Sequence, residues 1–550
     1  QISATEVGDF TIDITTAEPD PILPARVYMA GITSLKQIQE DPDSYSTHPI
    51  GSGPYKFVEW RRGDRLVMEA NPDWWGAGAA SRGEANYDVV EILFRPESAV
   101  RAAAVEAGEV DIAMWLTPEQ CESINKRAET RCEGRASPET IVIGMDQVDN
   151  PLLGDNRIRK AMILALDRET MVDQFFDNQA TIATQMAGPG AFGWNPNLVA
   201  HPYDPDQARA LVAEAKADGV PVDEVEIRVL ILQEAWSRSD EFALAFQQAL
   251  LDIGLNVPEL MIRERSTVQP WLADKPPSGT RDDNGQAWSI VIPFGHGNEI
   301  FDYLGSMGHL RCENAWSKVC YDDIDAATVA AGPLTGTDRQ AALYDIAELL
   351  HEKLYTIPVA HLDLSYGINN RIDWTIPLDH KIIAKHVWPA GTKPAAAPAA
   401  AAPSGDRSTL RMAVTEEPAG LDGWRTYKAE SGPGMLNMVE TLISRDPDTN
   451  ALVGELATGW EPVDELTWRF TLREGVTFHD GSPFNAEVAA FMINMNYSEE
   501  YNYEPRLFMG PQISATEVGD FTIDITTAEP DPILPARVYM AGITSLKQIQ

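Results

Sequence analysis

The sequence predicts an α/β protein with more than one lobe, because strand and helix patterns alternate along a chain too long for a single core. The chain has 550 residues, whereas single hydrophobic cores stop growing beyond about 250 to 300 residues. Hydrophobic residues make up 44% of it, enough to fill folded cores and to argue against general disorder. We therefore expect several α/β layers in separate lobes.

The charge balance limits the classes of partner. The chain carries 83 acidic against 43 basic residues, a formal net charge of −40. Such a surface repels phosphate backbones and anionic lipid headgroups, so nucleic-acid binding and membrane-surface binding are not expected. No apolar run reaches the roughly 18 to 20 residues that a membrane-spanning helix needs. A soluble, acidic protein is the expectation.

One 39-residue segment is present twice without a change, as residues 1–39 and 512–550. A verbatim copy at this distance suggests that the natural sequence has been circularly permuted. The chain would then continue past one full circuit by the length of the copy. The Ala/Pro-rich segment 391–405 has the composition of an extended linker, so we place the functional order as 406–550 followed by 40–390. Both copies cannot occupy one place in a fold, and we expect one to be displaced, exchanged with a neighbouring molecule or absent from the real chain.

Strand and helix patterns of the first lobe follow in that order. Residues 409–414 have the composition of a buried first strand, and apolar and polar residues alternate over 468–473 as in a half-buried strand. Asn485 is placed to cap a helix with core positions at the spacing i, i+3, i+4 and i+7. Further along, 55–60 and 65–69 form a predicted hairpin, and Ser98 is placed to cap a predicted helix that runs through Ala107 and stops at Gly108, before a strand over 110–114. In the duplicated segment, 10–14 alternates as a strand.

The second lobe is predicted over residues 201–357. Asp204 and Pro205 open a helix closed by Gly219, and a strand over 225–232, a helix over 242–251 and a strand over 287–293 follow. The remaining ranges are assigned to the first lobe, which is thus expected over 1–200, 358–390 and 406–550, with the linker at 391–405.

Five motifs give the chain a specific resemblance, since they occur in one order once the permutation is undone. The chain resembles the solute-binding proteins of ABC transporters, in the class (family 5) that binds dipeptides, oligopeptides, nickel, glutathione or opines. The motifs are Leu456–Glu461, Trp468–Glu487, Pro49–Tyr55, Arg157–Arg168 and Tyr203–Ala208.

The resemblance implies a two-lobed periplasmic-binding-protein fold (class II, cluster C type) with a hinge and a ligand cleft between the lobes. Ligand-driven closure of such a cleft is a shift of population toward the closed state. It also implies a monomer in the periplasm or at the cell envelope, which delivers a small peptide-like solute to a membrane permease. No catalytic residue, cofactor or bound structural metal is implied.

The resemblance places ligand contacts after two strands. Peptide-binding relatives carry an aromatic residue and an Asp after the strand that corresponds to 287–293, and the Asp pairs with the amino group of the peptide. Phe294 matches the aromatic residue, but the Asp position falls near Gly297, so Glu299, or His296 and Asn298 through neutral hydrogen bonds, are the candidates. A second contact region follows the first strand, with candidates Trp424, Tyr427 and Glu430.

Other solutes and chemistries remain open. The missing Asp favours an opine, a sugar conjugate or a metal chelate as an alternative solute. A peptide or amide hydrolase is the alternative of another class, but it needs an activated nucleophile, which the motifs do not supply. Residues 188–193 fit the dinucleotide pattern GxGxxG without the strand and helix it requires, so an irregular loop is expected there. Asp446–Asn450 lacks the later ligands of a calcium loop, so a turn between strands is expected instead. For His479, which precedes a turn, a structural role is favoured over acid/base catalysis.

Cysteine spacing favours disulfides over zinc. The four cysteines form two close pairs, Cys121 with Cys132 and Cys312 with Cys320, without the CxxC-like spacing that zinc sites use. Two small disulfide loops in an oxidising compartment are therefore expected, with free thiols as the alternative.

Overall fold

The computed structural model divides into two compact units. Among the described residues, the first unit has twenty-four helices and strands, including the two strands that cross from one unit to the other, and the second unit has twelve. The units comprise residues 1–135 with 364–550, and residues 136–363. The chain passes between them within β7 (Thr130–Met145) and again within β12 (Thr356–Asn369). The predicted lobe 201–357 lies wholly inside the second unit, and the other predicted lobe boundaries stay predictions. The described residues are 3–6, 11–15, 34–76, 85–147, 150–177, 179–232, 238–264, 267, 288–292, 298, 301–307, 310, 321–393, 408–418, 420–421, 432–462, 467–495, 514–519 and 522–526.

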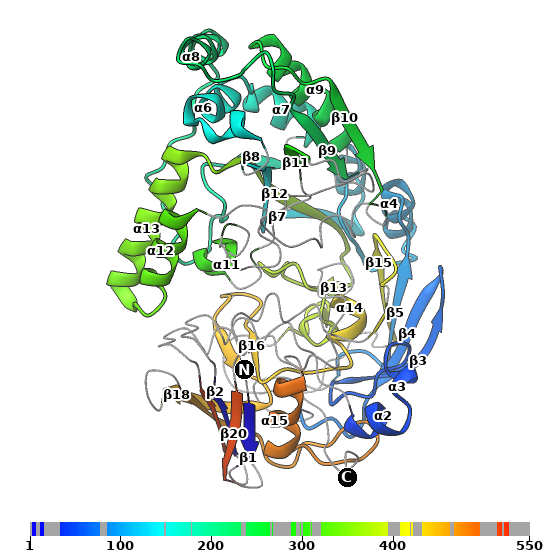
Figure 1. Ribbon diagram of the computed structural model, residues 1–550. Helices are drawn as coiled ribbons and strands as arrows, with labels where there is room; N and C mark the ends of the chain where they lie inside the picture. The colour runs from blue at the N-terminus through cyan, green and yellow to red at the C-terminus, as the bar shows by residue number, and fades with distance from the viewer. Residues whose placement is uncertain are drawn as a thin grey trace. The chain divides into compact units, whose positions relative to one another are not determined.

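A mixed sheet organises the first unit (Figure 1). Its order is β6–β15–β5–β4–β3, with β15 parallel to both β5 and β6 and the β3–β4 hairpin antiparallel to β5. The predicted strand at 409–414 and the predicted hairpin are confirmed. The strands are β3 (Tyr55–Arg61), β4 (Arg65–Ala70), β5 (Val89–Phe94), β6 (Ile112–Ala113) and β15 (Thr409–Val414).

Short helices and ribbons complete this unit. The helix predicted to be capped by Asn485 is confirmed, because the Asn485 side chain accepts a hydrogen bond from the Val488 N–H at 3.0 Å at the start of α15. Ser98 is the first residue of α4 rather than its cap, and its hydroxyl accepts instead from Gln120 Nε2 at 2.9 Å. The elements are α2 (Leu35–Glu40), α3 (Pro42–Tyr45), α4 (Ser98–Glu106), α5 (Pro118–Asn125), β13 (Ile372–Asp373), η4 (Ala384–His386), β14 (Trp388–Pro389), α14 (Gly432–Met435), β16 (Ile443–Arg445), β17 (Leu452–Gly454) and α15 (Ala486–Met495).

Both copies of the duplicated segment enter one further sheet, which lies against α15 (Figure 1). Its strand β2 pairs with β1, β20, β21 and β19. A strand has only two edges, so no more than two of these four strands can flank β2 along its full length at one time. The strands are β1 (Ser3–Glu6), β2 (Thr11–Thr15), β18 (Ala457–Pro462), β19 (Thr467–Leu472), β20 (Ser514–Gly519) and β21 (Thr522–Thr526).

The second unit is an α/β layer structure built around three parallel strands. Strands β10, β9 and β11 run parallel, and β11 pairs antiparallel with β7. The core beneath them is aliphatic and aromatic, with Phe242 and Phe246 of α9 fully buried. The elements are η2 (Pro151–Gly154), α6 (Asn156–Leu164), α7 (Arg168–Phe175), β8 (Ala180–Ile182), α8 (Pro205–Ala217), β9 (Arg228–Leu232), α9 (Ser239–Asp252), β10 (Glu259–Arg263), β11 (Ile290–Ile292), α11 (Tyr303–Met307), α12 (Asp322–Ala331) and α13 (Gly336–Lys353).

One of the two predicted disulfides is present. Cys121 on α5 and Cys132 on β7 are bonded and pack against a small core that includes Val105 and Ile124. The bond closes the turn between α5 and β7 from the outside of that core. Cys312 and Cys320 lie outside the described residues.

Candidate ligand-binding site

The two strands that lead into the predicted ligand contacts are inner strands with parallel neighbours. In the first unit β15 lies between β5 and β6, and in the second unit β11 lies between β9 and β7. Open α/β sheets bind ligands beyond the carboxyl ends of their parallel strands. The segments after Val414 and Ile292 therefore start from positions where a ligand site is expected.

Asn298 is the one predicted contact residue that falls among the described residues. Only 2% of it is exposed, and its Nδ2 donates to the Asp302 carbonyl and to the Ser306 hydroxyl, both at 3.0 Å. Its Oδ1 accepts from the Asp302 N–H at 3.3 Å. The amide thus holds the start of α11, and a ligand contact by Asn298 stays a prediction. The other predicted contacts lie outside the described residues, namely Phe294, His296, Glu299, Trp424, Tyr427 and Glu430.

A buried ion pair anchors the chain just after Asn298. Arg339 of α13 donates through Nη2 to Asp302 Oδ1 at 3.0 Å, and both residues are at most 3% exposed. Its Nη1 also donates to the carbonyls of Ala331 and Gly332. Breaking a buried pair leaves an uncompensated charge, so this pair ties the segment after β11 firmly to α12 and α13.

Arg101 holds the carboxyl edge of the first unit's sheet. This α4 side chain is 3% exposed, and it donates to the carbonyls of Met114 at 2.7 Å, Arg95 at 2.6 Å and Trp115 at 3.0 Å, as well as to Pro96. Those carbonyls belong to the segments that follow β5 and β6. Burial lowers the pKa of Arg101 to about 10, still far above neutral pH, so the guanidinium stays charged.

Trp115 is the residue that this arrangement places at the edge. It has a positive φ of 51°, which is uncommon for a bulky residue, while its neighbours Met114 and Leu116 are at most 1% exposed. Trp115 itself is partly exposed, and its Nε1 donates to the Tyr366 hydroxyl at 3.3 Å. Sequence reasoning passed over both Trp115 and Arg101, because an aromatic residue after an apolar strand looks like core.

The motifs that carry the family resemblance are structural where the structure describes them. His479 Nδ1 accepts from the Gly51 N–H at 3.3 Å, and its Nε2 lies 3.0 Å from the Gly53 carbonyl. Burial lowers the pKa of His479 to about 4, so the ring is neutral at neutral pH. Asp204 caps α8 by accepting from the Gln207 N–H, and Asp446 accepts from the Thr449 N–H in the turn between β16 and β17. These bonds agree with the structural role expected for His479 and with the turn expected at Asp446.

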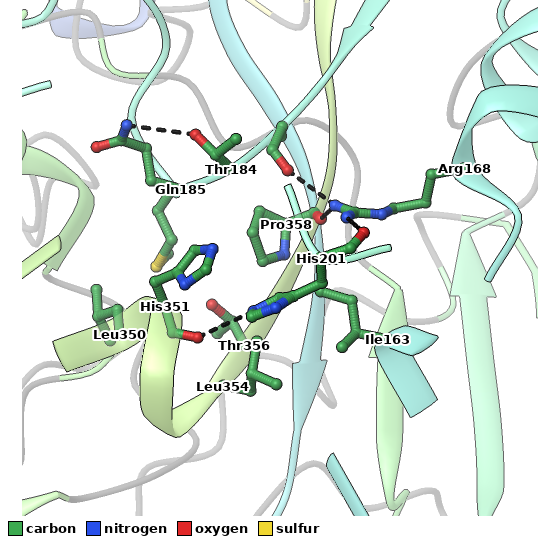
Figure 2. A pocket seen from close by; sticks show the side chains of 12 residues that line it. Ile163, Arg168, Thr184, Gln185, His201, Leu350, His351, Leu354, Thr356 and Pro358 are labelled. Carbon is green, nitrogen blue, oxygen red and sulfur yellow. Dashed lines mark hydrogen bonds between the residues drawn. The ribbon is translucent and has the colours of Figure 1, made fainter. Parts of the chain in front are cut away.

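A small cavity in the second unit gathers two histidines and an arginine (Figure 2). His201 Nδ1 lies 2.7 Å from Lys160 Nζ, and the rings of His201 and His351 are tilted by 30° with their centroids 4.1 Å apart. Burial, followed by the charges of His351 and Lys160, lowers the pKa of His201 to about 4. The cavity volume is about 10 Å³, whereas pockets for small molecules measure roughly 300 to 1,000 Å³. It is therefore not the solute site.

Two negative observations concern only the described part of the chain. No group of three or more His, Cys, Asp or Glu side chains there is arranged to hold a metal ion. Over the same residues, no helix combines the length and the apolar character that crossing a membrane demands.

Known proteins with the same architecture are periplasmic binding proteins. The structure matches the ABC-transporter substrate-binding protein CtaP from Listeria monocytogenes with a TM-score of 0.52 and 20% identity, over 62% of this chain and 67% of that one. It matches the periplasmic binding protein DppA from Helicobacter pylori, solved with the peptide STSA, with a TM-score of 0.51 and 17% identity, over 64% and 66%. The predicted fold class, an α/β periplasmic-binding-protein fold, is thereby confirmed.

Curated relatives point the same way. The chain is 24% identical to a probable di/tripeptide-binding protein of Pseudomonas aeruginosa over 64% of its own length and 65% of that protein. It is 23% identical to heme-binding protein A of Haemophilus influenzae over 65% and 64%. The chain thus spans slightly less than two thirds of the length of these relatives.

The family match extends over more than half of the chain. Residues 1–290 and 451–548 match the family described as "bacterial extracellular solute-binding proteins, family 5 Middle". These ranges contain each of the five motifs that carried the resemblance. The chain belongs to the bacterial extracellular solute-binding proteins of family 5.

Proposed function

We propose that this protein is the solute-binding component of an ABC importer and that it captures a small peptide-like solute without altering it. The observation that carries the proposal is the family match over residues 1–290 and 451–548. Relatives named for di/tripeptide binding, and a similar structure that holds a peptide, favour a peptide over other solutes. The partners in this proposal are the solute and a membrane permease, and the protein acts as a monomer and not as an enzyme.

The site geometry agrees with a binding role. In the described parts of the candidate site, backbone carbonyls are fixed by hydrogen bonds, and Asp302 forms a buried ion pair with Arg339. These described parts do not place a nucleophile beside a base, which a hydrolase would need. The candidate contacts Phe294, His296, Asn298, Glu299, Trp424, Tyr427 and Glu430 remain proposals, as does closure of the two lobes on the solute.

The relative named for heme binding keeps a second class of solute open. Without the expected Asp near Gly297, an opine, a sugar conjugate or a metal chelate is the alternative cargo. A solute of this kind would lack the free amino terminus that Glu299 is proposed to bind.

Native mass spectrometry and calorimetry test the proposal directly. Purified protein should bind an alanine tripeptide with a 1:1 stoichiometry, and the peptide should be recovered intact after denaturation. Glu299→Gln should weaken binding about 10- to 100-fold, the loss expected for a hydrogen bond to a charged amino group, whereas the amino-acetylated peptide should bind both forms equally. Recovery of cleaved peptide would indicate a hydrolase, and co-purification of a chelate or sugar conjugate would indicate the alternative cargo.

A further inference from the structure

Trp115 stands at the carboxyl edge of the first unit's sheet, next to the strand that leads into a predicted contact region. The parallel register of β15 with β6 pairs Ala413 with Ala113, and Thr415 and Trp115 each follow two residues later, beyond the ends of the two strands. The Thr415 hydroxyl is buried and has no hydrogen-bond partner among the described residues. An aromatic residue and a hydroxyl without a partner in the described part of the chain thus both lie just beyond the carboxyl ends of neighbouring parallel strands, an edge where ligands bind in open sheets.

The backbone of Trp115 is held in a conformation that its side chain disfavours. Its φ of 51° lies in the left-handed region, and such residues persist only where the surrounding structure fixes them. The fixing contacts are Arg101 Nη2 on the Trp115 carbonyl at 3.0 Å and the Leu116 N–H on the Ser365 carbonyl at 3.0 Å. Residues held in this way cluster at ligand sites.

The ring is oriented by a chain of hydrogen bonds that ends in a second left-handed residue. Trp115 Nε1 donates to the Tyr366 hydroxyl, which lies 3.0 Å from His380 Nδ1. Tyr366 and His380 are at most 1% exposed, and His380 has a φ of 56°. Because the indole N–H is already used, the ring offers a ligand its π face and not a hydrogen bond.

We propose that Trp115 is a ligand-contacting residue that stacks on an aromatic or apolar side chain of the bound peptide. The inference rests on the proposed function. Arg101 and Tyr366 are positioning residues that set the backbone and the ring plane of Trp115. An aromatic side chain is favoured over a small one, since stacked or edge-to-face aromatic pairs gain energy beyond the area they bury.

Calorimetry with three tripeptides tests this assignment, with Ala-Phe-Ala, Ala-Lys-Ala and Ala-Ala-Ala as probes. Trp115→Ala should weaken Ala-Phe-Ala about tenfold, the size expected for loss of one aromatic contact, and should change Ala-Ala-Ala less than about threefold. Trp115→Phe keeps a ring and should retain most of the preference for Ala-Phe-Ala. Trp388→Ala removes another partly exposed Trp of the same unit and should leave the ratio of the affinities unchanged.

The ratio of the affinities separates a contact from a purely structural role. Equal weakening of all three peptides by Trp115→Ala, or no weakening at all, overturns the assignment while peptide binding by the unaltered protein stands. A greater loss for Ala-Lys-Ala than for Ala-Phe-Ala also overturns it, because the ring would then face a cation. Failure of the unaltered protein to bind any of the three peptides overturns the proposed function and the assignment together. If Trp115→Ala does not fold, Tyr366→Phe decides, since it removes the hydroxyl that orients the Trp115 ring and should lower the preference for Ala-Phe-Ala; an unchanged preference overturns the assignment.

Discussion

Two glycines of the first unit let separate backbone segments touch. A Cβ added to Gly51 would lie 2.1 Å from the Met438 carbonyl oxygen, and one added to Gly53 would lie 2.6 Å from the Met438 carbonyl carbon. The contact is also bonded, because the Gly53 N–H donates to the Met438 carbonyl at 2.8 Å. The glycines of this family motif are therefore needed for packing, and His479 supports the same loop from the other side.

Gly51→Ala should lower the free energy of unfolding by about 2 to 4 kcal/mol, because backbone atoms cannot move aside as a flexible side chain can. Urea denaturation followed by tryptophan fluorescence measures the change. Gly459→Ala in β18 is the matched control, since nothing lies within 4 Å of its added Cβ and its φ is not positive. A Gly51→Ala protein as stable as the control would contradict the close approach of Gly51 to Met438.

Among the elements, the strands of the duplicated segment compete for one position. Arg469 of β19 stands opposite Asp13 of β2 in one register and opposite Asp524 of β21 in another. Asp13 and Asp524 are the same residue in the two copies, and the same relation holds for Ile14 and Ile525. Either copy can therefore supply the strand beside β19, and the fate of the other copy stays a prediction.

This competition predicts non-additive effects of substitutions in the two copies. Ile525 is fully buried, and truncating such a residue to Ala normally costs about 2 to 5 kcal/mol. Ile525→Ala alone should cost less than about 1 kcal/mol, because the unaltered first copy can take the position, whereas Ile14→Ala with Ile525→Ala should show the full cost. Ile493→Ala in α15, buried but present once, should show it as a single change. Equal losses for the single and double variants in urea denaturation would show that one copy never takes the place of the other.

Element types followed from the sequence more readily than the site did. Periodicity predicted α8, α9, β15 and β19 within a few residues, because each has one buried face or one buried run. The strand expected over 110–114 is shorter, with β6 limited to Ile112–Ala113, because Val110 and Met114 flank the ladder instead of extending it.

The site depends on contacts between residues far apart in the chain. Arg101 holds Trp115 and Arg339 holds Asp302 from other elements, and no local pattern specifies such pairs. A left-handed Trp115 is equally invisible in a sequence, since its conformation is imposed by its neighbours. The candidate contacts came from family resemblance alone, and Asn298, the described one, has its amide bonded within the loop.

Over the whole molecule, acidification brings two opposing effects. Protonation of carboxylates relieves the repulsion within a chain of net charge −40. Against this, burial lowers the pKa of both His361 and His479 to about 4, and it lowers the pKa of His201 likewise. Most carboxylates titrate near or below pH 4.3, so the histidines dominate between about pH 6.5 and pH 5.

The histidine effect has a definite sign. In the unfolded chain a histidine binds its proton near pH 6.5, while the buried ring of His361 stays neutral down to about pH 4. The unfolded state therefore binds more protons in this window, and the free energy of unfolding falls as the pH falls. At about pH 5 each such histidine accounts for a loss of about 2 kcal/mol.

Removing one buried histidine should flatten this pH dependence. His361 is 4% exposed, and its Nδ1 lies 2.8 Å from the Thr140 hydroxyl. His361→Gln keeps a polar group there but cannot titrate, so the loss of stability between about pH 6.5 and about pH 5 should shrink by about 1.5 kcal/mol. Urea denaturation of this variant and of the unaltered protein at the two pH values measures the difference. An unaltered slope in His361→Gln would mean that His361 takes up its proton without unfolding, and that its burial does not keep the ring neutral.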